Sequence, residues 1–341
     1  MSYSIKDVAD RAGVSAATVS YVINGAKKVK LETRTRVEQA MSELHYSPNP
    51  IARRLRLGRN KIVGFITPYI TIPFYSNVLE SCAAALMEEG YRILIGGSNL
   101  NLNTERDLIN TLSNGIVDGI ILFSLCGNSK ELQDELPEDC PCVVVDVHYP
   151  AMVDCITHTF SDAFFEMVGY FKQRGHQKIG LFIGPAILNS VQEQIRAYRD
   201  ALNAHNLSFD ESMCVYFTRI SDIYSSVEQI MAKGCMALCF INSGIYRSAF
   251  YNSEKAEFVI PNGCDIVCAS ESPEDYYLLK PFPRIIVPTR EIGYLAAKQM
   301  LFRIEENYDS NKNAEKKKPE IKKIIIPCKL QYSQHEFLNT K

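Results

Sequence analysis

The sequence lacks the features that would place a protein in or across a membrane. None of its apolar runs approaches the length of about 20 residues that a bilayer-spanning helix needs. Its first residues show no basic segment followed by an apolar stretch, so no secretion signal is predicted. From these absences we expect a cytoplasmic protein that does not contact a membrane.

The patterns that mark many enzymes and metal proteins are missing as well. The six histidines stand apart, and neither a Gly-x-Ser-x-Gly nor a phosphate-loop pattern occurs. Asp146 and His148 could form an acid–base pair, but we expect them to point to opposite faces of a strand. The eleven cysteines lie in apolar segments, and the closely spaced pairs have no nearby histidine that could complete a zinc site. This favours buried reduced thiols over disulfides or bound zinc. We expect no enzyme, no metal and no cofactor.

What the sequence does have is an uneven distribution of charge. Residues 1–60 hold eleven Lys and Arg against five acids, a net charge of +6; the whole chain carries −2, which leaves −8 for the remainder. A basic head on an acidic body suits a polyanionic partner that binds at one end. A solvated basic face is the alternative, and charge alone does not decide between them.

A chain of 341 residues is longer than one hydrophobic core usually contains, so at least two packed units are expected.

The first sixty residues have the apolar spacing of three short helices. Ser4 can cap the first helix, Gly13 stops it, and Ser15 can cap the second. Two such helices need a small residue where they cross, which is Ala9, and a glycine in the turn between them. This pattern predicts a helix-turn-helix, whose second helix enters the major groove of DNA with its first residues facing the bases.

The outward residues of the second helix differ in what they can offer to a base. Those predicted to face base edges are Ser15, Ala16, Ala17, Thr18 and Tyr21. Alanine methyl groups can contact the methyl group of thymine, and the tyrosine hydroxyl can donate to a base or a phosphate. A third helix begins near residues 31–33, and Arg34 on it can reach phosphates.

These N-terminal residues resemble the LacI family of bacterial repressors. The matching segments are Ile5-Lys6-Asp7-Val8-Ala9, Ala12-Gly13-Val14-Ser15, Thr18-Val19-Ser20, Val22-Ile23-Asn24, Thr33-Arg34-x-Arg36-Val37 and Tyr46-Ser47-Pro48-Asn49. The resemblance implies a sequence-specific transcriptional regulator, a repressor by family default, that binds a palindromic operator in double-stranded DNA as a homodimer on the nucleoid. Many relatives carry Arg where this chain has Tyr21, which leaves the base read there open.

A short charged segment at residues 48–60 joins the head to the body. It is too short to be a stable helix by itself. The resemblance implies the hinge helix of the family, which orders on the operator and wedges a leucine into the minor groove. Leu55 stands where that leucine belongs; alternatively, it packs at the domain junction. The expected DNA contacts are Ser15, Ala16, Ala17, Thr18, Ser20, Tyr21, Asn24, Arg34, Asn49, Ala52, Arg53, Leu55 and Arg56.

From residue 61, apolar runs of strand length alternate with amphipathic stretches, which predicts parallel α/β units. One series of strands is expected at 62–67, 92–97, 119–123 and 142–147, and a second at 179–183, 212–217, 236–241 and 265–269. Helices are expected at 75–89, 105–114, 164–174, 192–205, 223–233 and 289–305. Two series predict two lobes. The resemblance implies a core of periplasmic-binding-protein type, with two Rossmann-like parallel sheets and three crossings between them.

The expected domain organisation follows from these elements. The helix-turn-helix domain spans 1–47, the hinge 48–60, and the effector-binding and dimerisation core 61–341. Crossings between lobes are expected near 158–160, 286–288 and 306–323. Lobe 1 is then about 61–158 plus 289–320, and lobe 2 about 159–288 plus 321–341. The lysine-rich stretch 311–319 is expected to be a solvated loop, with a second DNA contact as the alternative.

Ligands of open α/β sheets bind at the carboxyl ends of the strands, which in a two-lobed molecule means the cleft between lobes. Phe74 and Tyr75 follow the first strand and can line that cleft, or they can be core or dimer-interface residues. The family's polar ligand contacts are missing: this chain has Thr159-Phe160 for Asp-Asn, Gln194 for Arg, Asn242-Ser243 for Asn-Asp, and Ser270 for Asp. The cleft candidates are Phe74, Tyr75, Leu188, Ser190, Gln194, Asn242 and Ser270.

These losses predict a cleft that lacks the family's usual polar contacts to sugar hydroxyls or a purine. Three outcomes stay open: a less polar small-molecule effector, a protein co-regulator, or no effector. The alternative function is a solute-binding or protein-interaction sensor whose DNA binding is not effector-controlled. Apolar residues on the first helix of the body are candidates for the dimer contact, or else are core: Val78, Leu79, Cys82, Ala83 and Leu86.

Overall fold

A computed structural model describes most of the chain. The described residues are 3–23, 29–46, 59–149, 152–217, 223–252, 257–258, 263–271, 282–313 and 320–332. The chain divides into two compact units, Met1–Asn60 and Lys61–Lys341. Of the hinge predicted at 48–60, all but the last two residues lie outside the described residues.

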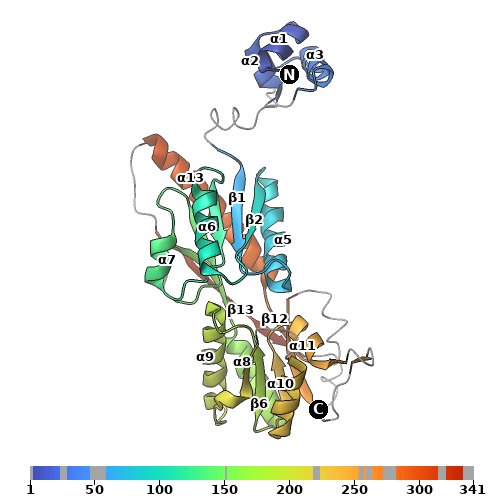
Figure 1. Cartoon of the computed structure of the whole chain (residues 1–341), viewed down its shortest axis with the longest axis vertical. Helices are drawn as coiled ribbons and strands as arrows, with labels where there is room; N and C mark the ends of the chain where they lie inside the picture. The colour runs from blue at the N-terminus through green and yellow to red at the C-terminus, as the bar shows by residue number, and fades with distance from the viewer. Residues whose placement is uncertain are drawn as a thin grey trace. The chain divides into compact units, whose positions relative to one another are not determined.

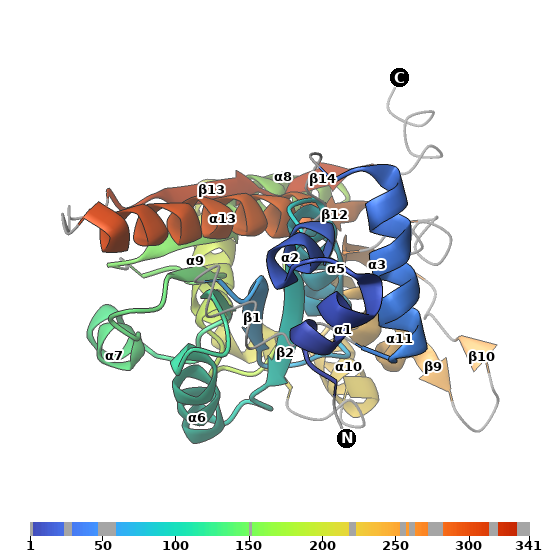
Figure 2. The ribbon, with the colours of Figure 1, turned by 90° about the horizontal axis from the view of Figure 1, so that it is seen from above.

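Three helices form the first unit: α1 (Ile5–Ala12), α2 (Ala16–Ile23) and α3 (Leu31–Glu43), which can be followed in Figure 2. Ser4 caps α1 as predicted, because its hydroxyl accepts the Asp7 N–H while the Asp7 carboxylate accepts the Ser4 N–H at 2.7 Å. Gly13 ends α1 in the left-handed conformation, with φ 65°. The helices enclose a small core of Val8, Ala9, Ala12, Val19, Val22, Val37 and Ala40.

Lobe 1 of the second unit is a six-stranded parallel sheet in the order β13-β5-β4-β3-β1-β2. Its strands are β1 (Ile62–Thr67), β2 (Arg92–Gly97), β3 (Gly119–Leu122), β4 (Cys142–Val145), β5 (Asp154–Thr159) and β13 (Lys323–Pro327). Helices α5 (Pro73–Glu88) and α13 (Thr289–Asn313) pack on one face. Helices α6 (Leu102–Ser113) and α7 (Ser129–Glu135) pack on the other.

Lobe 2 is a second six-stranded sheet in the order β14-β12-β11-β8-β6-β7, parallel except for the β12–β14 pair. Its strands β6 and β12 are labelled in Figure 1. Its strands are β6 (Ile179–Ile183), β7 (Cys214–Tyr216), β8 (Ala237–Phe240), β11 (Asp265–Ser270), β12 (Arg284–Ile286) and β14 (Lys329–Gln331). Its helices are α8 (Ser161–Gln173), α9 (Asn189–Ala204), α10 (Ile223–Ala232) and α11 (Ser243–Phe250), with a 3₁₀ turn η1 (Glu211–Met213) and a hairpin of β9 (Tyr251–Asn252) and β10 (Glu257–Phe258). The predicted two-lobed α/β fold is therefore present.

The third crossing between lobes was predicted in the wrong place. After α13 the chain enters β13, which pairs in parallel with β5 of lobe 1, and it crosses at Cys328 into β14 of lobe 2. Residues up to 327 thus belong to lobe 1, whereas the sequence assigned everything after 320 to lobe 2. A run of isoleucines indicates a strand but does not indicate which sheet it joins.

The predicted dimer surface on α5 is wrong for three of its five residues. Val78, Cys82 and Leu86 are fully buried in the core of lobe 1. Helix α13 approaches this side of α5 so closely that a Cβ on Gly293 would lie 2.3 Å from the Val78 carbonyl oxygen.

Among the described residues, no helix is both long and apolar enough to cross a membrane.

Candidate DNA-reading helix and inter-lobe cavity

Helix α2 presents Ala17 and Tyr21 on the side away from the small core, whereas Ala16 packs against that core. Val19 and Val22 are buried and hold the helix against α1 and α3. Tyr21 is 60% exposed and Ala17 is also exposed, whereas Ala16 is half-buried. The arrangement exposes the Ala17 methyl group and the Tyr21 phenol.

The two hydroxyls at the start of α2 are engaged with each other. Ser15 Oγ accepts the Thr18 N–H at 3.2 Å and lies 2.9 Å from Thr18 Oγ1. This is the predicted N-cap, which satisfies one of the unpaired N–H groups of the first turn. Ser20 and Arg34 are half-buried. The remaining predicted DNA contacts lie outside the described residues: Asn24, Asn49, Ala52, Arg53, Leu55 and Arg56.

A cavity of about 420 Å³ lies between the two lobes. Most of its wall is aromatic or aliphatic. Six of the seven predicted cleft residues line it: Phe74, Tyr75, Leu188, Ser190, Gln194 and Asn242. Ser270 does not; it is the last residue of β11, and Glu271 after it lines the cavity instead. Lining side chains that the prediction missed include Tyr69, Ile72, Asp146, His158, Phe160, Phe217 and Arg247.

Asp146 and two histidines form a buried polar cluster in the wall of the cavity. Asp146 Oδ1 lies 3.1 Å from His148 Nε2 and 3.3 Å from His158 Nδ1. The prediction that Asp146 and His148 face opposite sides is wrong, because residues two apart on a strand share a face. Here the chain has already left β4, which ends at Val145, and Asp146 adopts a φ of 61°. Asp146 directly follows β4 and His158 is the next-to-last residue of β5, so both lie near the carboxyl ends of strands, which was a usable sequence signal for the cleft.

The charge states in this cluster follow from its surroundings. Burial alone would raise the pKa of Asp146, but the His158 and His148 rings and the Ser190 hydroxyl hold it below its ordinary value. Burial lowers the pKa of His158. At neutral pH, Asp146 is therefore ionised. Phe74 and Phe160 flank the His158 ring, with centroids 5.2 and 5.3 Å away.

Gln194 brings an unsatisfied acceptor to the cavity wall. Its side chain is buried, and its Oε1 has no hydrogen-bond partner among the described residues. A buried acceptor without a partner is destabilising by about 1–3 kcal/mol. Asn242, by contrast, is partly engaged, because its Oδ1 accepts the Ile245 N–H at 2.8 Å at the start of α11. Gln194 is thus the polar group best placed to gain from a ligand that donates a hydrogen bond.

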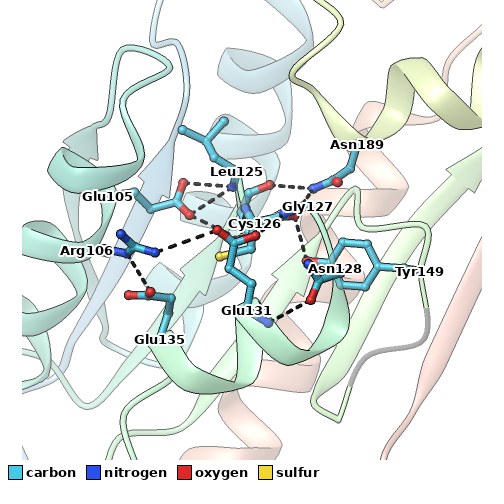
Figure 3. A network of polar contacts seen from close by, with 11 residues as sticks. Glu105, Arg106, Leu125, Cys126, Gly127, Asn128, Glu131, Glu135, Tyr149 and Asn189 are labelled. Atoms are coloured by element: carbon cyan, nitrogen blue, oxygen red, sulfur yellow. Dashed lines mark hydrogen bonds and ion pairs between the residues drawn. The ribbon is translucent and has the colours of Figure 1, made fainter.

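The start of α9 is tied to a turn of lobe 1, residues 124–127 (Figure 3). Asn189 Nδ2 donates to the carbonyl oxygens of Ser124 and Cys126, both at 3.0 Å. Beneath the turn, the two carboxylate oxygens of Glu105 accept the Leu125 N–H at 2.9 and 3.1 Å. Because Leu188 and Ser190 beside Asn189 line the cavity, the first residues of α9 link the cavity to this turn of lobe 1.

Glu105 is a carboxyl group in an apolar place. It is fully buried, and burial raises its pKa to about 7, although the Leu125 N–H and the Ser124 hydroxyl act in the opposite direction. Around it, Arg106 pairs with Glu135 at 2.6 Å, and Glu131 accepts the Gly127 N–H at 2.8 Å (Figure 3). The turn is therefore held from below by carboxylates of α6 and α7.

A helix-turn-helix unit joined to a two-lobed α/β core with a central cavity defines a DNA-binding transcriptional regulator. Residues 4–49 match the family model described as "Bacterial regulatory proteins, lacI family". Residues 60–335 match that of "Periplasmic binding proteins and sugar binding domain of LacI family". The chain belongs to the LacI family.

Individual relatives agree with this assignment. The chain is 29% identical to the transcriptional repressor PurR of Edwardsiella ictaluri over 312 residues, which cover 88% of this chain and 90% of that one. It is 28% identical to the ribose operon repressor of Bacillus subtilis over 300 residues, 87% and 90% of the two chains. Both relatives are repressors. The fold matches the lac repressor dimer bound to operator with a TM-score of 0.80 at 19% identity, covering 97% of this chain and 98% of that one.

Proposed function

We propose that this chain is a transcriptional repressor that binds a palindromic operator as a homodimer and is controlled by a small-molecule effector less polar than a sugar. The two relatives named above support repression, and the helix-turn-helix supports operator binding. Two-fold symmetric dimers bind palindromic sites because each head reads one half-site. The regulator then acts in the cytoplasm, on the nucleoid.

In this proposal, both the head and the hinge contact DNA. We assign base contacts to α2 and phosphate contacts to Arg34. Residues 1–47 are the head and 48–60 the hinge, with Leu55 as the minor-groove wedge. Apolar wedges of this kind kink DNA and widen the area of contact.

The dimer contact needs a different surface from the one the sequence suggested. The edge strand β2 carries Leu94 and Ile95, which are 41% and 45% exposed. Met87, near the end of the neighbouring α5, is 61% exposed. An edge strand with exposed apolar side chains invites pairing or coverage by another chain. We propose that a second copy covers this surface.

The observation that carries the effector proposal is the composition of the cavity wall. Its aromatic and aliphatic majority favours an apolar ligand. Its lobe 1 carboxylate, Asp146, is already engaged by two histidines and Ser190, which reduces its capacity to bind hydroxyls. The unpaired Gln194 Oε1 selects a ligand with one donor group facing α9.

Thermal unfolding in the presence of metabolites tests the effector proposal. A ligand present at 100 times its Kd stabilises the folded state by about 2.7 kcal/mol, so true effectors give a clear increase in Tm. We expect such an increase from aromatic or other weakly polar metabolites and none from hexoses or purines. A large increase with a hexose or a purine would contradict the proposal. Operator binding that no metabolite alters would favour a protein co-regulator or effector-independent repression.

A further inference from the structure

The reading helix of this chain lacks the side chains that recognise most bases. From Ser15 to Ile23 there is no Arg, Lys, Asn, Gln, Asp or Glu. In the major groove, guanine is typically read by Arg or Lys, adenine by Asn or Gln, and cytosine by Glu or Asp, because these side chains match the groups that those bases present; Ser and Thr can bond to more than one base and so discriminate less. Helix α2 can make none of these contacts.

The hydroxyl groups at the start of α2 do not make up for this absence. Ser15 and Thr18 are hydrogen-bonded to each other and to the backbone of the first turn. A base contact by either one would compete with the cap. What α2 exposes instead is the methyl group of Ala17 and, one helical turn later, the ring of Tyr21.

Thymine is the base that such a surface recognises. Its C5-methyl group projects into the major groove and is read by apolar contact, to which alanine methyl groups and aromatic rings are suited. We infer that Ala17 and Tyr21 are the specificity-determining residues of α2 and that they read thymine methyl groups, with no guanine-specific contact. This inference rests on the proposed function and specifies the operator: the base pairs facing α2 are T·A pairs.

The expected effect of one methyl contact is modest and measurable. Burial of one methylene-sized group is equivalent to about a fourfold change in an equilibrium constant. Replacing the contacted thymine with uracil removes the methyl group and nothing else. A thymine contacted by Ala17 or Tyr21 should therefore lose about threefold to fivefold in affinity when replaced by uracil.

The test begins with selection of duplexes from a random pool by the full-length protein. Each thymine of the selected half-site is then replaced by uracil, one at a time, and Kd is measured for the wild type, Ala17→Gly and Tyr21→Ala. We expect at least one thymine at which uracil weakens wild-type binding threefold to fivefold but changes the affinity of one variant less than 1.5-fold. Tyr21→Phe is the matched control, because it keeps the ring, and it should retain the uracil effect.

This double-mutant design separates a methyl contact from a general loss of folding, because a misfolded variant weakens binding to both duplexes equally. Uracil replacements that leave wild-type affinity unchanged at every position would overturn the inference. So would a half-site that requires G·C pairs opposite α2, with losses above tenfold when they are changed. If no sequence is enriched from the pool, the proposed function itself fails.

Discussion

Replacing Glu105 with glutamine should remove a pH dependence of stability that the wild-type protein carries. Glu105 is fully buried and accepts the Leu125 N–H with both oxygens. Burial raises its pKa from an ordinary value of 4.5 to about 7. Glutamine retains an oxygen that can accept the Leu125 N–H but cannot ionise, so the variant keeps the shape of the contact and loses its titration.

The sign and size follow from proton binding in the two states. A folded-state pKa above the unfolded one means that the folded protein binds the proton more tightly. The stability that Glu105 contributes is therefore complete below about pH 4.5 and is lost as pH rises to about 7. Since one pKa unit corresponds to about 1.4 kcal/mol, the loss is on the order of 3 kcal/mol.

Urea unfolding at constant ionic strength from pH 5 to 7.5 provides the measurement. The free energy of unfolding of Glu105→Gln should rise relative to that of the wild type by most of this amount across the range. Taking the difference between the two proteins cancels the other titrating groups, including His158, whose lowered pKa gives a slope of opposite sign. Parallel pH profiles for the two proteins would refute the reasoning.

Three further substitutions test other contacts. Asn189→Ala removes both hydrogen bonds from α9 to lobe 1, so we expect a larger radius of gyration by X-ray scattering without effector; an unchanged radius would contradict the role. Arg303→Met leaves the buried Asp154 carboxylate without its cation and should lower the free energy of unfolding by about 3–5 kcal/mol in urea; a loss below 1 kcal/mol would argue against it. Gln194→Leu should raise Tm without ligand and abolish the increase that an effector produces, whereas a retained increase would exclude contact with Gln194.

Local patterns in the sequence were sufficient for most of the fold. The strands at 62–67 and 179–183 have the predicted bounds, because each is a continuous apolar run buried in a parallel sheet. The strand at 92–97 also has its predicted bounds, although it is a partly exposed edge strand. Strand β12 has three residues, and helix α7 is short and polar, so neither gave a periodic signal. Short elements like these depend on their tertiary neighbours.

The site was less predictable than the fold, for two physical reasons. Phe74 and Tyr75 could be placed at the cleft because they follow the first strand, and Gln194 because it stands where the resemblance puts a ligand-contacting residue. The contact of Asp146 with His158 joins residues of two different strand ends, and Asp146 adopts a left-handed backbone that is uncommon for a non-glycine residue and is not indicated by the sequence. Likewise, the apolar face of α5 could be recognised, but α13, which covers it, is more than 200 residues away in the chain. Periodicity identifies a buried face without identifying its partner.

The most direct test of the central claim compares the full-length protein with a fragment of residues 61–341, the second compact unit. Binding of the selected operator is measured by fluorescence anisotropy, and the mass of each protein by light scattering. We predict that the full-length protein binds its operator at least about 10³-fold more tightly than random duplex. The fragment should show no specific binding but should retain the mass of a dimer. A fragment that still bound the operator specifically would contradict the account.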